Sequence, residues 1–209
     1  MKHVRDGRRL AIAAALVLSL AAAGTVAGSA AADRSSKTEA AEFQQKLVAI
    51  HAHAERKNRE SLRTAISERE VNAYLALEGA DTLPPGVANV RVSLLGPGRL
   101  SGSATVDLDV VRRGQKASGS MLDPMAFLTG KLPVSVIGVL TTRAGQGRFE
   151  LESAEIAGVR VPKMVIDELL AYYAKTPGTP KGVTVDSSFP LPDRIQQIDV
   201  QRGQAIVIQ

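Results

Sequence analysis

The 209-residue sequence predicts an α+β protein, in which an antiparallel sheet of hairpins is covered by an apolar helix and preceded by a long N-terminal helix. Strict alternation of apolar and polar residues predicts the sheet, because successive side chains of a strand point to opposite faces. Apolar residues three and four positions apart predict the helices, because that spacing places them on one helix face. The apolar face of such a sheet needs a cover, which the apolar helix can supply.

Residues 1–32 have the three parts of a secretory signal peptide. Residues 1–9 carry four basic side chains, residues 10–23 carry no charge, and three alanines at 30–32 provide a cleavage site. An uncleaved anchor is the alternative, because weakly apolar residues continue to Ala32 and the whole stretch reaches the roughly 20 residues that a spanning helix needs. Both interpretations place the rest of the chain in the periplasm or on the extracytoplasmic face of the cytoplasmic membrane, because the basic segment stays inside.

The composition excludes several classes of protein. The leader holds four of the 26 basic residues and one of the 21 acidic residues, so the mature chain is close to neutral. With interspersed charges and no tryptophan, we expect no nucleic-acid partner. The absence of cysteine excludes disulfides, thiolate metal sites and a cysteine nucleophile. An exported chain of this kind must be stabilised by its core alone, and it is long enough for one such domain.

Two helices are predicted before the sheet begins. The first is an amphipathic helix within residues 33–65, running from Ser36 to Ala65, because this stretch lacks glycine and proline and is rich in good helix formers. The second begins at a capping box formed by Ser67 and Glu70 and ends near Gly79. Residues 66–209 are predicted to form one α+β domain.

The first predicted hairpin has one apolar and one polar face. Apolar residues alternate with polar ones at 90–94 and again, after a Gly-Pro-Gly turn, at 100–110. On the second strand, Gly102 and Ala104 make the apolar face small, which leaves room for something to lie against it. Asp107 and Asp109 fall on the polar face of this predicted strand. They could hold a cation there, although a polar outer surface is the simpler interpretation.

The remaining strands and the covering helix follow in order. Residues 132–142 and 148–156 predict two more strands, and 195–200 with 205–208 predict a final hairpin. A helix begins at Pro162, a good first helical residue, and reaches Ala174. Its apolar stripe, which we expect to cover the sheet, consists of Val165, Ile166, Leu169, Leu170 and Tyr173.

A catalytic site is not expected, and no cofactor or metal is either. His51 and His53 are two positions apart, so on a helix they point about 200° around from each other and cannot share an ion. His3 is the third histidine, and it lies in the leader. No nucleophile elbow and no phosphate-binding glycine motif occurs in the sequence. The sequence therefore does not favour an enzyme.

Two functions remain open on the residues alone. A sheet that curls around a helix can enclose an elongated apolar groove, which would bind an acyl chain by hydrophobic burial. The alternative is a closed core, which would leave a non-catalytic envelope scaffold or interaction protein. In that case an envelope protein partner would bind the helix from Ser36 to Ala65.

The order of motifs resembles a known group of proteins. The stretch from Ile66 to Leu75 (ISEREVNAYL) is followed by PGV at 85–87, GVRVP at 158–162 and FPLP at 189–192. This order is similar to that of small bacterial exported proteins with TULIP-like (tubular lipid-binding) modules, including the LmeA-type phospholipid-binding family and YpmS-like proteins. The resemblance spans residues 66–209, and it does not include the preceding helix.

The resemblance implies a twisted antiparallel sheet wrapped around the apolar helix, with lipid bound between them. It implies a protein of envelope lipid handling, with a lipid or acyl-chain ligand. A membrane surface is a further candidate partner. The helix would line the groove with Val165, Ile166, Leu169, Leu170 and Tyr173. The sheet would line it with Val106, Leu108, Val134 and Val136.

Overall fold

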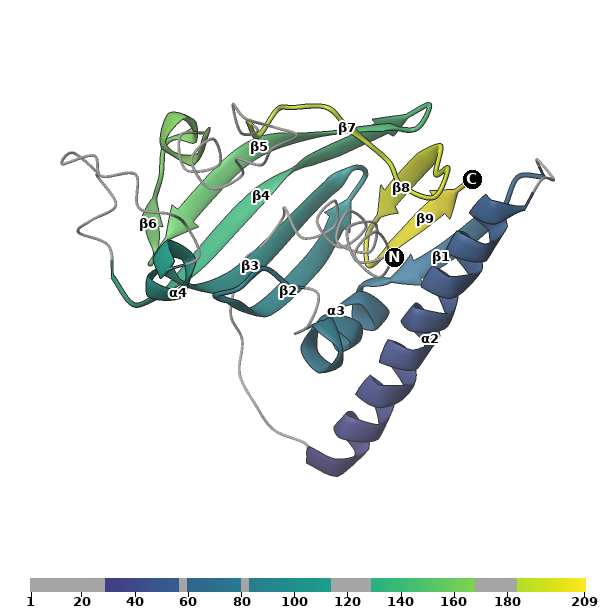
Figure 1. The fold of residues 1–209 in the computed structure, drawn as a ribbon, viewed down its shortest axis with the longest axis horizontal. Helices are drawn as coiled ribbons and strands as arrows, with labels where there is room; N and C mark the ends of the chain where they lie inside the picture. Colours follow the sequence, from purple (N-terminus) through teal and green to yellow (C-terminus); the bar gives the residue numbers. More distant parts are fainter. Residues whose placement is uncertain (1–28, 57–59, 80–82, 114–128, 168–183) are drawn as a thin grey trace.

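The computed structural model (Figure 1) describes residues 29–56, 60–79, 83–113, 129–167 and 184–209. Helices and antiparallel strands are mixed in this part of the chain, which confirms the predicted α+β class. The leader up to residue 28, residues 114–128 and the predicted helix beyond Asp167 lie outside the described residues. No described helix is both long enough and apolar enough to span a membrane.

The described strands form two antiparallel sheets. The larger one has the strand order β2-β3-β4-β5-β6, with β7 paired to β5, and the smaller one has the order β1-β9-β8. The helices are α2 (Ser29–Glu55), α3 (Glu68–Leu77) and α4 (Leu108–Arg113). The strands are β1 (Arg63–Ser67), β2 (Val87–Gly96), β3 (Arg99–Asp107), β4 (Lys131–Arg143), β5 (Gln146–Ile156), β6 (Val159–Arg160), β7 (Phe189–Pro190), β8 (Gln197–Gln201) and β9 (Gln204–Ile208). The hairpins predicted at 90–110, 132–156 and 195–208 are therefore present.

The N-terminal helix is shorter than predicted. Helix α2 ends at Glu55, and Arg63–Ser67 forms β1, so the prediction that the helix reaches Ala65 was wrong. The reason is tertiary: β1 pairs along its whole length with β9, so its backbone hydrogen bonds go to the sheet. A segment rich in good helix formers can still form a strand when a neighbouring strand pairs with its backbone.

Helix α2 packs onto α3 and belongs to the core. Ala40, Phe43 and Ile50 are buried on one side of α2, and the Phe43 ring lies 5.1 Å from that of Tyr74 on α3. Lys46 Nζ donates to Glu70 Oε1 at 2.5 Å, with the Glu70 side chain 7% exposed. Burial would raise the pKa of Glu70, but hydrogen bonds from Lys46 and Ser67 outweigh it and hold that pKa below its usual range.

The predicted capping box is confirmed at the start of α3. Glu70 N donates to Ser67 Oγ at 3.2 Å, and Ser67 N donates to Glu70 Oε2 at 2.7 Å. Each side chain thus satisfies a backbone N–H that the first helical turn leaves unpaired. Because Glu70 also binds Lys46, one carboxylate both starts α3 and attaches α2 to it.

Side chains of α3 close the free edge of β2. Asn72 Nδ2 donates to Val92 O, and Val92 N donates to Asn72 Oδ1, both at 2.7 Å. Leu94 N donates to Glu68 Oε2 at the same distance. An unpaired strand edge is a template for aggregation, and here carboxylate and amide groups take the place of a neighbouring strand.

The first hairpin ends earlier than its alternation predicts. Strand β3 ends at Asp107, whose Oδ1 accepts hydrogen bonds from Asp109 N and Val110 N at 3.1 Å each. Aspartate in this position caps a helix N-terminus, so the chain turns into α4 at Leu108. The expectations that the strand continues to 110 and that Asp107 and Asp109 share its polar face were wrong. Asp109 Oδ2 instead accepts from Gly130 N, so both carboxylates have structural roles.

Candidate apolar ligand site

The strand register collects apolar side chains on one face of the six-stranded sheet. Residues directly opposite in an antiparallel pair point to the same face, so the pairing fixes which residues share it. This apolar face contains Val87, Val92, Leu94, Leu100, Gly102, Ala104, Val106, Leu132, Val134, Val136, Gly138, Leu140, Phe149, Leu151, Ala154, Ile156 and Val159. The opposite face carries charged pairs, among them Arg99 with Glu152 at 2.7 Å.

The half of the apolar face next to α3, here the proximal half, is closely packed. It consists of Val92, Leu94, Leu100, Leu140 and Phe149, all buried in one cluster that includes residues of α2, α3 and the three-stranded sheet. The Phe149 ring lies over Gly138, where an added Cβ would come within 2.3 Å of Phe149 Cζ. The missing side chain of Gly138 thus makes room for the Phe149 ring, and no space for a ligand remains at this position.

The other half, here the distal half, lies toward α4 and β6 (Figure 1) and is less buried. It consists of Val87, Val106, Leu132, Val134, Val136 and Ile156, all half-buried. One row crosses four strands through the direct pairs Ala104–Val134, Val134–Ile156 and Ile156–Val159. Exposure along this row rises from 9% at Ala104 to 66% at Val159. The sheet therefore presents a continuous apolar row that starts in the core and ends in solvent.

A short helical turn, residues 163–167, is the described part of the predicted covering helix. Ile166 packs against the core cluster, and Asp167 Oδ1 accepts from Val185 N at 2.8 Å. That hydrogen bond is the main reason that the pKa of Asp167 is lowered. Lys163 bonds Asp186 at 2.7 Å and Asp167 at 3.1 Å, and these bonds raise its pKa. The turn is thus fixed to residues 184–187.

The structure brings together only part of the predicted lining. Val106, Val134 and Val136 lie together on the distal half, and their lining role stays a prediction. Leu108 does not, because it is the first residue of α4 and is buried there at 8% exposure.

The lining predicted for the helix is described only at its start. Ile166 is half-buried and Val165 is 38% exposed. Leu169, Leu170 and Tyr173 lie outside the described residues. For these three positions the lining role stays a prediction.

Three residues of the distal half were missed by sequence reasoning. Leu132 and Ile156 sit at apolar positions of strands that were predicted, so alternation could have assigned them once the register was known. Val87 was missed because β2 begins there, three residues before the predicted strand. The irregular pairing between Ala88 and Arg91 hides this start, because it interrupts the alternation.

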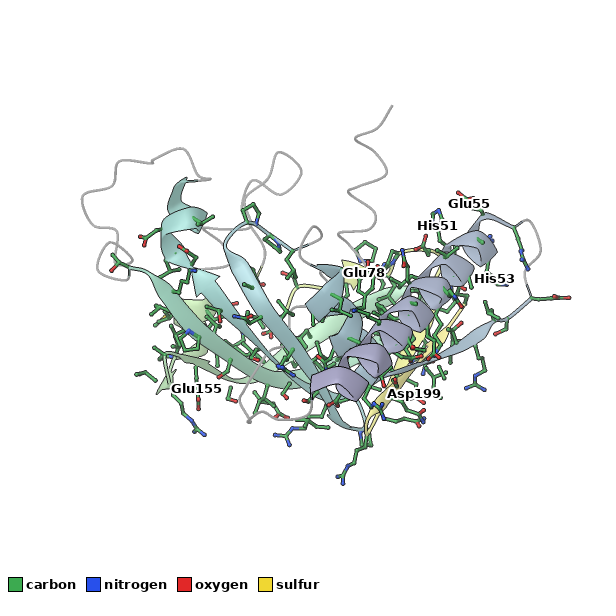
Figure 2. The ribbon with its side chains drawn as sticks, turned by 90° about the horizontal axis from the view of Figure 1, so that it is seen from below. His51, His53, Glu55, Glu78, Glu155 and Asp199 are labelled. Carbon is green, nitrogen blue, oxygen red and sulfur yellow. The ribbon has the colours of Figure 1, made fainter. Side chains whose placement is uncertain are left out.

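The histidines of α2 do not form a metal site. His51 Nδ1 lies 2.8 Å from Asp193 Oδ1 and His51 Nε2 lies 3.5 Å from Glu55, so this histidine joins α2 to the segment before β8. Figure 2 shows His53 on a different side of the helix from His51 and Glu55. Among the described residues, no cluster of three histidine, cysteine or acidic side chains could hold a metal ion.

The fold and this surface define the class of protein: an α+β protein whose larger sheet carries a graded apolar face. Searches against protein-family models, curated proteins and solved structures find no match.

Proposed function

We propose that this protein is a non-catalytic binding protein of the cell envelope that holds a lipid or another apolar ligand on the distal half of its apolar face. The observation that carries the proposal is the row from Ala104 to Val159, which begins at a buried residue, continues through two half-buried ones and ends at an exposed one. A closed core would bury such residues. A ligand chain lying along them would gain about 25 cal/mol for each Å² of apolar surface removed from water.

The leader and the order of motifs support the same proposal. A signal peptide or anchor would deliver the chain to a compartment bounded by lipid. The first buried residue described on α2 is Ala40, so cleavage after residue 32 would leave the buried positions of that helix in place. The group of proteins that the motifs resemble binds lipid between a helix and a sheet.

The alternative function, a scaffold that presents its N-terminal helix to a partner, is less well supported. Phe43 and Ile50 of α2 are buried in the core cluster, at 4% and 2% exposure. A helix that contributes these side chains to its own domain cannot leave to join a partner without exposing them. For the same reason, a variant that lacks Ser36 to Ala65 would unfold. Loss of a binding partner in that variant would therefore not support the scaffold function.

Lipid carried by the native protein tests the proposal directly. The protein is purified from its own envelope without detergent and analysed by native mass spectrometry and by solvent extraction. We expect a bound lipid or acyl chain in a fixed ratio to protein. Protein that carries none, and that takes up no fluorescent fatty acid, would contradict the proposal.

A matched pair of variants places the ligand. Val134→Thr puts a hydroxyl on the distal half with little change of shape, whereas Val139→Thr does so on the opposite face of the same strand, where Val139 is also half-buried. We expect Val134→Thr to weaken fatty-acid binding about fivefold to tenfold, because an unpaired hydroxyl at an apolar contact costs about 1 kcal/mol. Val139→Thr should leave binding unchanged. Equal effects of the two substitutions would remove the ligand from the apolar face.

A further inference from the structure

The C-terminal end of α2 is attached to the rest of the protein by polar contacts rather than by burial. Ile50 is the last buried residue described on the helix, and residues 51–56 are exposed or half-buried. This end of α2 meets a turn at residues 192–195, in which Ile195 N donates to Pro192 O at 3.0 Å. A helix end that polar groups hold can separate from its neighbour at lower cost than one held by buried side chains.

The turn at 192–195 lies where α2 and both sheets meet. Leu191 N, just before the turn, donates to Gly145 O in the β4–β5 hairpin of the larger sheet at 2.8 Å. Gln209 Nε2, just after β9 of the smaller sheet, donates to Asp193 O at 2.6 Å. The contact between α2 and this turn therefore determines how firmly the end of the helix is joined to the two sheets.

The backbone of the turn is strained. Asp193 and Arg194 have φ values of 50° and 57°, in the left-handed region that favours glycine. Their side chains bind the end of α2. Arg194 Nη1 donates to Ala54 O at 2.9 Å and to Arg56 O at 3.0 Å, and the Asp193 carboxylate binds His51. Strained residues persist where the contacts around them hold them in place, and they are common in segments that switch.

The His51 ring lies between two carboxylates, one at each ring nitrogen. Nδ1 is 2.8 Å from Asp193 Oδ1, and Nε2 is 3.5 Å from Glu55 Oε1, which Figure 2 shows beside His51 at the end of α2. A neutral ring has one N–H, whereas a protonated ring presents an N–H and a positive charge to both carboxylates. The Asp193 side chain is 9% exposed, and a carboxylate so far from water needs a compensating cation. The helix dipole at the C-terminus of α2 also favours the protonated ring.

The other groups that face His51 do not replace this charge. On the turn, Arg194 binds the carbonyls of α2, and within the described ranges Asp193 has no cation other than His51 at ion-pair distance. At the end of β9, the Gln209 amide is uncharged. On α2 itself, His53 lies on a different side of the helix.

We propose that His51 is a pH-sensitive latch, which holds the end of α2 on the turn at 192–195 when its ring is protonated and loosens it when the ring is neutral. Histidine changes its charge between about pH 5 and about pH 8, so the latch works in a range that an exported protein meets. It acts on the polar end of α2 alone, because Phe43 and Ile50 keep the rest of the helix in the core. The latch does not depend on the proposed ligand.

A double-mutant cycle at two pH values tests the latch in the full-length protein. His51→Gln keeps a hydrogen-bond donor that cannot become charged, and Asp193→Asn removes the carboxylate with a residue that tolerates positive φ. These two variants, the double variant and the control His53→Gln on the same helix are unfolded with urea at about pH 5 and at about pH 8.

We expect His51→Gln to raise the unfolding equilibrium constant about threefold to fivefold over the wild type at the lower pH, and less than about twofold at the higher pH. The difference has this sign because a histidine that gains a carboxylate partner on folding stabilises the fold at low pH, and this stabilisation is lost as the pH rises. His53→Gln should match the wild type at both pH values. In the Asp193→Asn background, most of the effect of His51→Gln should disappear.

Hydrogen exchange followed by mass spectrometry locates the change. At the lower pH, the amides of residues 52–56 should exchange faster in His51→Gln than in the wild type, while those of residues 40–47 should not differ.

Four results would overturn the latch. An effect of His51→Gln that is equal at the two pH values would mean that the histidine acts in its neutral form. The same pH dependence in His53→Gln would remove the specificity for His51. A pH-dependent effect that persists in full without the Asp193 carboxylate would remove the partner, and unchanged exchange at residues 52–56 would show that the end of α2 is not what the histidine holds.

Discussion

The two halves of the apolar face have the same alternation and share the same strands, yet they are covered differently. The proximal half packs against α3 and the three-stranded sheet, and its members Leu100 and Leu140 are 3% and 6% exposed. The distal half has residues of the same kind, but Leu132 and Val134 are only half-buried. Figure 1 shows α2, α3 and the three-stranded sheet gathered at one end and α4 and β6 at the other.

This difference shows where stability and adaptability lie in the molecule. Paired hydrogen bonds from side chains to the backbone, here called polar clamps, stabilise the proximal half. Asn72 makes such a pair with the β2 edge, and the hydroxyl of Thr142 both donates to Ile198 O and accepts from Ile198 N. Such clamps fix one arrangement of the chain, because each leaves buried polar groups unpaired if it is broken. A surface that must admit an apolar ligand needs apolar contact without such clamps. The following substitutions test this division.

The largest effect is expected where α2 enters the core. Phe43→Ala should lower the free energy of unfolding by about 3–5 kcal/mol, because it removes a buried ring and its contact with Tyr74. Val48→Ala, on the same helix but 63% exposed, should change it by less than about 0.5 kcal/mol. Urea unfolding followed by circular dichroism measures both. A Phe43→Ala protein as stable as Val48→Ala would show that α2 is not part of the proximal core.

A leucine pair on β4 compares the two halves directly. Leu140 and Leu132 lie on one strand and one face, so they differ mainly in burial. Leu140→Ala should cost about 3 kcal/mol of unfolding free energy and Leu132→Ala about 1 kcal/mol. In fatty-acid binding the order should reverse, with Leu132→Ala weakening affinity more than Leu140→Ala. Equal losses of stability would abolish the distinction between the halves.

The contact between α3 and the β2 edge should come next. Asn72→Ala removes both hydrogen bonds to Val92 and should cost about 1–3 kcal/mol of unfolding free energy, because it leaves backbone groups of a packed strand unpaired. Gln204→Ala is the control, since that exposed amide donates to Gln201 at 3.1 Å on the surface. We expect it to cost less than about 0.5 kcal/mol. If the two variants unfold at the same urea concentration, Asn72 does not stabilise the β2 edge.

Local patterns predicted most of this fold because they act over short distances. The capping box of Ser67 and Glu70 was read correctly, and so were the hairpins that turn at Gly98, Gly145 and Gly203, each with a positive φ that favours glycine. Asp107 carried a local signal too, since aspartate favours helix N-caps, but the alternation that continues past it suggested a strand.

Long-range pairing was what the sequence could not specify. Thr64 and Ile66 suit a strand, but residues 63–67 become one only through pairing with β9, which lies some 140 residues later. The motif residue Asn72 likewise gains its role only when β2 is placed beside α3. For the candidate site, alternation assigned Val106, Val134 and Val136 to one face, but the extent of their burial depends on which elements pack against each half.

The smallest effect concerns charge, and it compares two carboxylates with lowered pKa values. Glu70 belongs to the proximal core, whereas Asp167 holds the turn at 163–167 and its side chain is 25% exposed. A carboxyl group whose pKa is lower in the folded than in the unfolded state stabilises the fold fully above its unfolded pKa, and this stabilisation is lost as the pH falls through the folded value. For Glu70 the loss should begin near pH 4.5.

Glu70→Gln tests this without removing the cap, because glutamine also completes a capping box. Its unfolding free energy should fall short of the wild type at pH 7, and the gap should shrink as the pH falls below 4.5. Asp167→Asn should show the same sign with a smaller gap, because the Lys163–Asp167 pair is more exposed to water and salt. Urea unfolding at a series of pH values measures both gaps. If Asp167→Asn loses more unfolding free energy than Glu70→Gln, the carboxylate of the turn at 163–167 contributes more to stability than the carboxylate that attaches α2 to α3.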